Sequence, residues 1–274
     1  MSAMTLSRAR ALPGTSSTKR PWLPLLGPAT VVGVFLLWEL LSRVGALPAY
    51  AFPSALDVLG AFVTALGTGT FWAAVGATVQ SAGIGLIILA ALAAVIALVV
   101  TSSRFASNST WFLIEFLKPI PPVALIPLGL LLWGPSPTMK IVLVVFGAIW
   151  PLLTQLIYGI RAVEGVTLDV ARSYRLGFVR TTTHVVAPSI VPYALNGLRV
   201  SAAIAIVISI VTEMIGGAAG LGQEVILAQL ANDLPTMYAL ILATGLLGLG
   251  VNGLFRALER PLLFWHPSQR GDRP

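Results

Sequence analysis

Long apolar runs separated by short polar segments make up most of this chain of 274 residues. Six such runs follow one another, near residues 23–43, 72–100, 110–133, 140–160, 190–215 and 237–258. A helix rises about 1.5 Å per residue, so each run can cross a hydrocarbon core about 30 Å thick. Backbone polar groups in lipid must be bonded internally, which favours helices. The pattern predicts an all-α polytopic membrane protein with about six transmembrane helices.

Composition and charge support the same class. Hydrophobic residues make up 57% of the chain and charged residues 10%, which is far from the balance of a soluble domain. The formal net charge is +7, but basic residues in a membrane protein mainly orient its loops. We therefore expect contact with membrane lipid and no nucleic-acid partner. Cysteine is absent, which excludes disulfides and thiolate metal sites.

The ends of the chain differ from its middle. Residues 1–21 form a polar leader that we expect to be disordered, residues 22–266 form the transmembrane domain, and residues 267–274 form a basic tail. The first apolar run could instead be the core of a signal peptide, because Ala49-Tyr50-Ala51 resembles a cleavage site. Such cores usually span about 7–15 residues, so the longer run favours an uncleaved helix.

Two longer polar segments separate the apolar runs. Residues 50–70 predict a short amphipathic helix outside the membrane that begins after Ser54. Residues 216–235 are rich in glycine and predict a loop outside the membrane.

The third apolar run is interrupted by Lys118-Pro119-Ile120-Pro121-Pro122. Proline lacks a backbone donor, so a straight helix cannot pass through this stretch. Irregular backbone at membrane depth is tolerated only against protein or a water-filled path. The break is therefore either a structural kink or a part of the transport path.

The fifth apolar run carries a face of small and polar side chains. Ser201, Ser209, Thr212 and Gly216 fall within an arc of about 80° on a helix that turns roughly 100° per residue. Such a face can hold helices together or line a pore.

Charged residues inside apolar runs are functional candidates, because a charge at membrane depth is costly unless it is paired or hydrated. Glu39 and Glu115 lie near predicted helix ends, where they can reach headgroup water. Glu213 lies near the end of the fifth run, where we expect it to bond the following loop rather than to contact the substrate. Lys118 is interpreted as the one basic side chain well inside a run, paired with Glu115 or facing an anionic solute. The candidate path residues are Lys118, Pro121, Pro122, Ser201, Ser209, Thr212 and Glu213.

The distribution of basic residues predicts the orientation of the chain. With six alternating helices, one side of the membrane receives nearly all of them: Arg8, Arg10, Lys19, Arg20, Arg104, Arg161, Arg172, Arg175, Arg180, Arg256, Arg260, Arg270 and Arg273. The other side holds little beyond Arg43 and Lys140, which we place at helix edges. The positive-inside rule then puts both termini and residues 163–188 in the cytoplasm.

The cytoplasmic segment 163–188 has the pattern of a short helical surface. Thr167 can cap a helix, and Asp169 lies favourably near its positive end. Val163, Val166, Val170 and Tyr174 recur on one face of that helix. An apolar ridge framed by arginines suits a groove on another protein, although the arginines could also meet anionic lipid headgroups.

Two motifs in this segment resemble the EAA loop of ABC importer permeases. Asp169-Val170-Ala171 stands where that family has Glu-Ala-Ala, and Val186-Ala187-Pro188 resembles the end of its loop. The resemblance implies a cytoplasmic pair of coupling helices that fits a cleft on an ATPase subunit. The residues that it assigns to ATPase coupling are Thr167, Asp169, Val170, Ala171, Arg172, Tyr174, Arg175, Gly177, Arg180 and Pro188.

Motifs elsewhere are similar to the nitrate/sulfonate/taurine branch of that family. They are Ile120-Pro121-Pro122-Val123-Ala124-Leu125-Ile126-Pro127-Leu128, Asn196-Gly197-Leu198-Arg199, Glu213-Met214 and Gly220-Leu221-Gly222. The resemblance implies the type I ABC importer permease fold. It also implies a small solute such as a sulfonate, taurine or a nitrate-like anion, although members of the branch also take pyrimidine-type vitamin precursors.

The chain departs from this pattern at two places. Arg175 stands where the family has glycine, so we expect the turn between the coupling helices to be built differently. The branch often has Ser-Leu-x-Arg where this chain has Thr78-Val79-Gln80-Ser81. No inference about the substrate can therefore rest on that arginine.

The chain contains no phosphate-binding loop of the Gly-x-x-x-x-Gly-Lys-Ser/Thr type, so we expect a non-catalytic subunit. His184 and His266 have no metal-ligand partner at helical spacing. The resemblance implies two copies of an ABC ATPase that bind ATP and Mg, a second permease copy, and an extracytoplasmic substrate-binding protein. It places the complex in the bacterial inner membrane.

Two other classes of transporter are also all-α membrane proteins. A secondary transporter would show inverted repeats and paired charges in the membrane. A transmembrane subunit of the vitamin energy-coupling type would have differently placed arginines. The motifs above favour the ABC importer.

Overall fold

A computed structural model describes residues 23–163, 169, 171 and 173–263. It divides into two compact units, residues 1–55 and residues 56–274. In the first unit, helix α1 (Leu23–Arg43) coincides with the first apolar run, and Arg43 pairs with Glu39 one turn earlier. The predicted leader and tail, and also Thr167, Val170, Arg172 and His266, lie outside the described residues.

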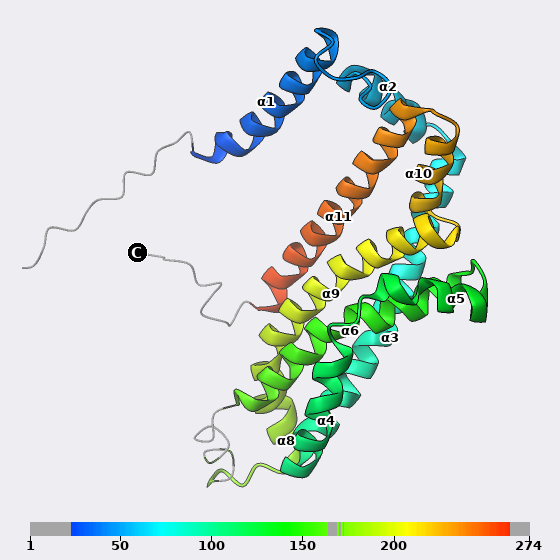
Figure 1. The fold of residues 1–274 in the computed structure, drawn as a ribbon. Helices are drawn as coiled ribbons and strands as arrows, with labels where there is room; N and C mark the ends of the chain where they lie inside the picture. Colours follow the sequence, from blue (N-terminus) through cyan, green and yellow to red (C-terminus); the bar gives the residue numbers. More distant parts are fainter. Residues whose placement is uncertain (1–22, 164–168, 170, 172, 264–274) are drawn as a thin grey trace, which may run out of the picture. The chain divides into compact units, whose positions relative to one another are not determined.

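The second unit is built around three long helices that lie side by side (Figure 1): α3 (Gly69–Ser102), α6 (Pro137–Arg161) and α9 (Ala187–Gly216). Their shared core includes Leu89, Val144, Leu153 and Ala205, each at most 1% exposed. A fourth long helix, α11 (Leu234–Leu262), packs against α9. Among the described residues, four helical stretches are long and apolar enough to span a membrane, or five with a bent pair. The predicted all-α membrane fold is confirmed.

Helices α6 and α9 approach each other closely because glycines lie at their crossing. A Cβ atom on Gly197 would lie 2.9 Å from Gln155 Cβ and 3.0 Å from Leu152 Cα. A Cβ atom on Gly159, near the end of α6, would lie 3.0 Å from the Cβ atom of Tyr193, near the start of α9. Such close backbone approach is typical of membrane helices with small residues at their interface. The two helices therefore form a tightly joined pair.

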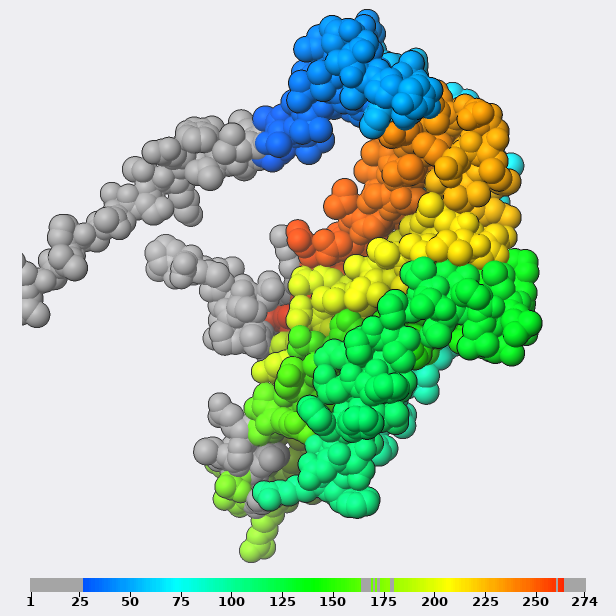
Figure 2. All heavy atoms as spheres, in the orientation of Figure 1, coloured from blue at the N-terminus to red at the C-terminus, as the bar shows by residue number. Residues whose placement is uncertain are grey.

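The third apolar run is a bent pair, as the prolines predicted. Helix α4 (Arg104–Leu117) and the segment formed by η1 (Pro122–Leu125) and α5 (Ile126–Trp133) meet at an angle of 80°. The pair lies on the face turned to the viewer in Figure 2. Large apolar side chains on it are exposed, including Trp111, Phe112, Phe116 and Leu131. A surface of this kind suits contact with lipid.

Two shorter helices form a second hydrophobic cluster at one end of the unit. Helix α2 (Ala55–Leu66) is the predicted amphipathic helix, and α10 (Leu221–Leu230) lies between α9 and α11. Leu221 and Val225 of α10 pack with Phe71 of α3 and Leu240 of α11. The prediction that residues 216–235 form only a loop was wrong, because two glycines at the start of α10 mask its apolar face.

The segment that links α6 to α9 lies at the opposite end of the unit, which we call the coupling end; the end that carries α10 is the far end (Figure 1). The described residues Asp169, Ala171 and Ser173 are helical. Helix α8 (Phe178–Thr181) then continues through a π-helical turn η2 (Thr182–Val186) into α9. Residues 169–188 are called the coupling segment below.

The crossing of α6 and α9 can be tested by adding a side chain to Gly197. Gly197→Val should lower the melting temperature in detergent, because overpacking costs about 1–3 kcal/mol. Gly253→Val in α11 is the control, because a Cβ atom there meets nothing within 4 Å. Equal losses of stability in the two variants would contradict a tight crossing.

Candidate functional site

A lysine and a glutamate form an ion pair inside the far end of the second unit. Lys140 lies in the first turn of α6, and Glu213 lies in the last turn of α9. Lys140 Nζ is 2.8 Å from Glu213 Oε1, and the two side chains are 1% and 0% exposed. Both charges are therefore removed from solvent.

The Glu213 carboxylate accepts hydrogen bonds from three further groups. Thr78 Oγ1 of α3 donates to Oε2 at 2.9 Å, and Ser209 Oγ of α9 donates to Oε1 at 3.2 Å. The backbone N–H of Gly222 in α10 donates to Oε2 at 3.0 Å. One carboxylate thus joins four helices: α3, α6, α9 and α10.

The Lys140 ammonium group is satisfied as fully as its partner. Besides the carboxylate, Nζ donates to the carbonyl oxygens of Ala77 at 3.2 Å and Ala219 at 2.7 Å. An ammonium group has three donors, and all three are used. Thr78 Oγ1 also accepts the N–H of Leu221 at 3.0 Å, which satisfies a backbone donor at the start of α10. We call these residues the Lys140–Glu213 network.

Glycines make room for this network. A Cβ atom on Gly220 would overlap the Glu213 carboxylate, and one on Gly222 would overlap the carbonyl oxygen of Ile210. Only a residue without a side chain fits at these two positions. The two glycines of the Gly220-Leu221-Gly222 motif are therefore explained by the space that the Glu213 side chain and its helix occupy.

The structure shows how two of the predicted charges are paired. Lys140 lies at a helix edge, as predicted, in the first turn of α6, and it is enclosed by protein at 1% exposure. Lys118, interpreted as the basic residue inside a span, is 41% exposed and lies 3.7 Å from Glu115, its predicted partner. The predicted bond from Glu213 to the segment that follows it is confirmed, but its donor, the Gly222 N–H, lies in the helix α10 rather than in a loop.

The small polar face of α9 points into the protein. Ser201 and Ser209 are 0% exposed and Thr212 is 1% exposed, while Gly216 lies against Met139 of α6. Ser201 Oγ is buried without a hydrogen-bond partner in the described part of the chain. Burial of this kind is what a helix-packing face requires, whereas its role in a path stays a prediction.

The remaining path candidates lie at the bend between α4 and α5. Pro121 is exposed, and Pro122 is half-buried where η1 meets α6. A Cβ atom on Gly147 of α6 would overlap the Pro122 ring, so this glycine admits the proline. The bend is thus fixed by packing against α6 as well as by its prolines.

In the coupling segment, Arg175 takes a backbone conformation that glycine favours. Its φ angle is +52°, and the N–H of Leu176 donates to the carbonyl oxygen of Ala171 at 3.0 Å. A left-handed residue followed by this bond is the Schellman ending of a helix. The sequence predicted a differently built turn because Arg175 replaces glycine, yet Arg175 adopts a glycine-like conformation.

Among the described residues around this turn, one is buried and most of the others are exposed. Ala171 is 2% exposed, whereas Tyr174 is 77% exposed, and Asp169, Gly177 and Arg180 are also exposed. Pro188 lies in the first turn of α9, directly after the π-helical turn. π-helical turns occur often at functional sites. The segment therefore offers an anchored surface at the coupling end.

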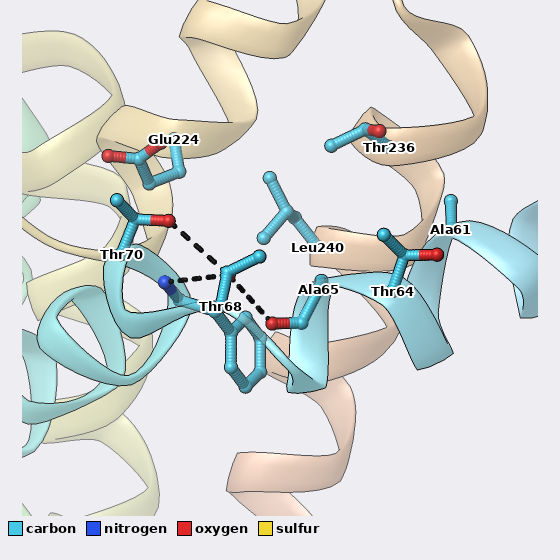
Figure 3. A pocket seen from close by; sticks show the side chains of 9 residues that line it. Ala61, Thr64, Ala65, Thr68, Thr70, Glu224, Thr236 and Leu240 are labelled. Atoms are coloured by element: carbon cyan, nitrogen blue, oxygen red, sulfur yellow. Dashed lines mark hydrogen bonds between the residues drawn. The ribbon is translucent and has the colours of Figure 1, made fainter.

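A cavity of about 300 Å³ opens at the far end between α2, α3, α10 and α11. Figure 3 shows its polar wall, where Thr64, Thr68, Thr70, Thr236 and Glu224 line the space. Thr68 Oγ1 donates to the Ala65 carbonyl and accepts from Phe71 N–H, so it caps α3. Among the described residues, no three His, Asp or Glu side chains are placed to hold a metal ion.

Another ion pair joins α9 to α11 nearer the coupling end. Arg199 Nη1 donates to Glu259 at 3.1 Å, and Arg199 Nη2 donates to Asn196 Oδ1 at 3.1 Å. Three members of the Asn196-Gly197-Leu198-Arg199 motif thus have defined tasks: two of them anchor α11, and Gly197 admits α6.

Comparison with known proteins defines the class to which this arrangement belongs. A family model described as binding-protein-dependent transport system inner membrane component matches residues 83–263. The match includes the Glu213 and Lys140 positions and the whole coupling segment. The chain belongs to this family: it is a multi-pass inner-membrane permease component of an ABC transporter with the type I fold. The resemblance noted in the sequence is confirmed.

Individual relatives cover nearly the whole chain. It is 26% identical to the putative aliphatic sulfonates transport permease protein SsuC of Bacillus subtilis (strain 168), over 98% of this chain and 100% of that protein. It is 30% identical to the protein of the same name from Escherichia coli (strain K12), over 91% and 95%. The riboflavin transport system permease protein RibX of Chloroflexus aurantiacus is 26% identical, over 96% and 99%.

Removing one member of the buried pair should be costly. Lys140→Met leaves the Glu213 charge enclosed and unpaired, which costs about 3–5 kcal/mol. Lys140→Met should strongly lower the melting temperature in detergent, and Lys140→Met/Glu213→Leu should restore much of it. The control is Lys118→Met, because the exposed Lys118–Glu115 pair contributes about 1 kcal/mol at most. A similar effect of both single substitutions would show that the Lys140 site is hydrated.

The turn at Arg175 gives a separate prediction. Arg175→Gly should slow amide hydrogen exchange in peptides covering 171–181, because a non-glycine residue in the left-handed region costs roughly 1–2 kcal/mol. Arg180→Gly should speed exchange in the same peptides, because Arg180 lies in the helix α8. Faster exchange in Arg175→Gly would contradict the left-handed turn.

Proposed function

We propose that this permease is the transmembrane subunit of an ATP-driven importer, and that its coupling segment docks on a cytoplasmic ATPase. The observation that carries the proposal is the geometry of that segment: Ala171 is buried, a Schellman turn fixes Arg175, and Asp169 and Tyr174 are exposed. Because the coupling segment continues directly into α9, an ATPase bound to its surface can move this helix within the membrane.

The family and the charge pattern support the assembly that we propose. Arg104, Arg161 and Arg180 all lie at the coupling end, which supports a cytoplasmic orientation of this end. Both termini are cytoplasmic in the proposed scheme. Two ATPase subunits bind ATP and Mg and close on each other. Their closure moves the coupling segments of two permease copies, which open a central path alternately to each side. A homodimer of permeases and an extracytoplasmic binding protein complete the importer.

The cargo that fits best is a small anion such as an alkanesulfonate, taurine or nitrate. Support comes from two relatives whose names specify aliphatic sulfonates, over at least 91% of this chain. Riboflavin transport by another relative marks the alternative cargo class, a vitamin-like ring compound. The binding protein selects the cargo in this scheme, and the permease supplies the path.

A gradient-driven transporter is the competing class, because paired charges in the membrane can serve ion coupling. Lys140 and Glu213 form such a pair. Each polar group of the pair is, however, already bonded to Thr78, Ser209 or backbone atoms, and both side chains are enclosed. This geometry favours a structural role for the pair, and family membership favours ATP coupling.

Docking is tested by changing the surface of the coupling segment. Asp169→Lys/Ala171→Glu should abolish co-purification of the ATPase from detergent, because one change reverses a surface charge and the other introduces a charge at a buried contact. The control is Asp57→Lys/Ala228→Glu, which makes the same changes at one exposed and one buried position of the far end. Equal recovery of ATPase with both variants would refute docking at this segment.

The cargo class is tested by uptake in the native organism. Deleting the gene for this chain should reduce uptake of radiolabelled taurine to background, and a plasmid copy should restore it. Riboflavin uptake should be unchanged. Loss of riboflavin uptake with normal taurine uptake would transfer the chain to the vitamin-like class.

A further inference from the structure

Helix α9 connects the two ends of the second unit. It begins at the coupling segment and contains 30 residues, so it extends about 45 Å at 1.5 Å per residue. Its last turn carries Glu213. A movement that reaches Ala187 at one end of α9 can therefore be transmitted along this stiff helix to the Lys140–Glu213 network at the other end.

Helix α9 is held along its length by α6. Gly197 lies against the backbone of α6 at Leu152, and Gly159 of α6 lies against the Tyr193 side chain of α9. Lys140 in the first turn of α6 pairs with Glu213. The pair is thus joined in the middle, near the coupling end and at the far end. Two helices fastened at three levels move together rather than slide.

Helix α10 is held to this pair by polar bonds at its start. Gly222 N–H donates to Glu213, Leu221 N–H donates to Thr78, and the Ala219 carbonyl accepts from Lys140. These directional bonds fix the position of α10 along α9, whereas its apolar contacts with Phe71 and Leu240 tolerate sliding.

We propose that Lys140 and Glu213 are positioning residues for transport: they fasten α10 to α3, α6 and α9, so that movement entering at the coupling segment also moves the far end. The inference rests on the proposed ATP-driven function. Under it, the α3–α6–α9–α10 assembly moves as one body.

A purely stabilising role does not account for the chemistry of the network. A buried ion pair is often no more stabilising than apolar residues of similar volume. What apolar residues cannot supply is direction: four helices meet at one carboxylate through bonds of 2.8–3.2 Å. The network therefore specifies where α10 lies relative to its neighbours.

The test uses the complex of permease and ATPase reconstituted with its binding protein. In Lys140→Met/Glu213→Leu we expect a melting temperature well above that of Lys140→Met, because no unpaired charge is left in the protein. ATP hydrolysis should be retained, but solute moved per ATP hydrolysed should fall about tenfold. Amide exchange should rise in peptides covering 221–230 and stay unchanged across 190–210. The control is Glu39→Leu/Arg43→Met, which removes an ion pair in the other unit and should leave all four readouts unchanged.

The outcomes separate the possibilities. A stable double variant with unchanged coupling and unchanged exchange in α10 would overturn the proposal, as would parallel losses of hydrolysis and uptake together with general instability. Thr78→Val keeps the ion pair but removes the bond to Leu221, and it should give the same changes to a smaller extent. If no ATPase binds the permease, the proposed function fails. Amide exchange in α10 of the isolated chain would still test whether the Lys140–Glu213 network holds α10 against its neighbouring helices.

Discussion

The structure of the second unit depends on one constraint: a carboxylate and an ammonium group are enclosed together where α3, α6, α9 and α10 meet. Neither charge tolerates this environment alone, so each helix must present its partner atom at hydrogen-bond distance. The glycines at 220 and 222 follow from the volume that the carboxylate needs. The glycines at these two positions and the close packing of the four helices thus depend on a single ion pair.

The coupling segment is the counterpart at the other end. There the backbone, rather than a charge, defines the geometry: Arg175 is left-handed, Leu176 closes the helix on Ala171, and a π-helical turn leads into α9. Helix α9 is the shared element, because it starts in this segment and finishes at Glu213. Membership of the family shows that the chain is an ABC permease. The position of α9 supports the proposed transmission of movement from the ATPase to the far end of the second unit.

The sequence predicted the features that have a local cause. The helices follow from hydrophobic runs, and the 80° bend follows from the prolines after Lys118. The Lys140–Glu213 pair was missed because its members lie 73 residues apart, and Lys140 sits at the start of a run, where a helix edge was the simpler interpretation. A lysine and a glutamate that each stand alone in an apolar run could have suggested a pair. Helix α10 was missed because glycines hide its pattern.

The central claim is that this chain works as part of a complex, driven through its coupling segment. The most direct measurement is native mass spectrometry of the complex purified from its own membrane through a tag on this chain. The account predicts two copies of the permease with two copies of a protein that contains a phosphate-binding loop. A stable particle that contains this chain alone, and still transports solute in vesicles with an ion gradient and no ATP, would contradict it.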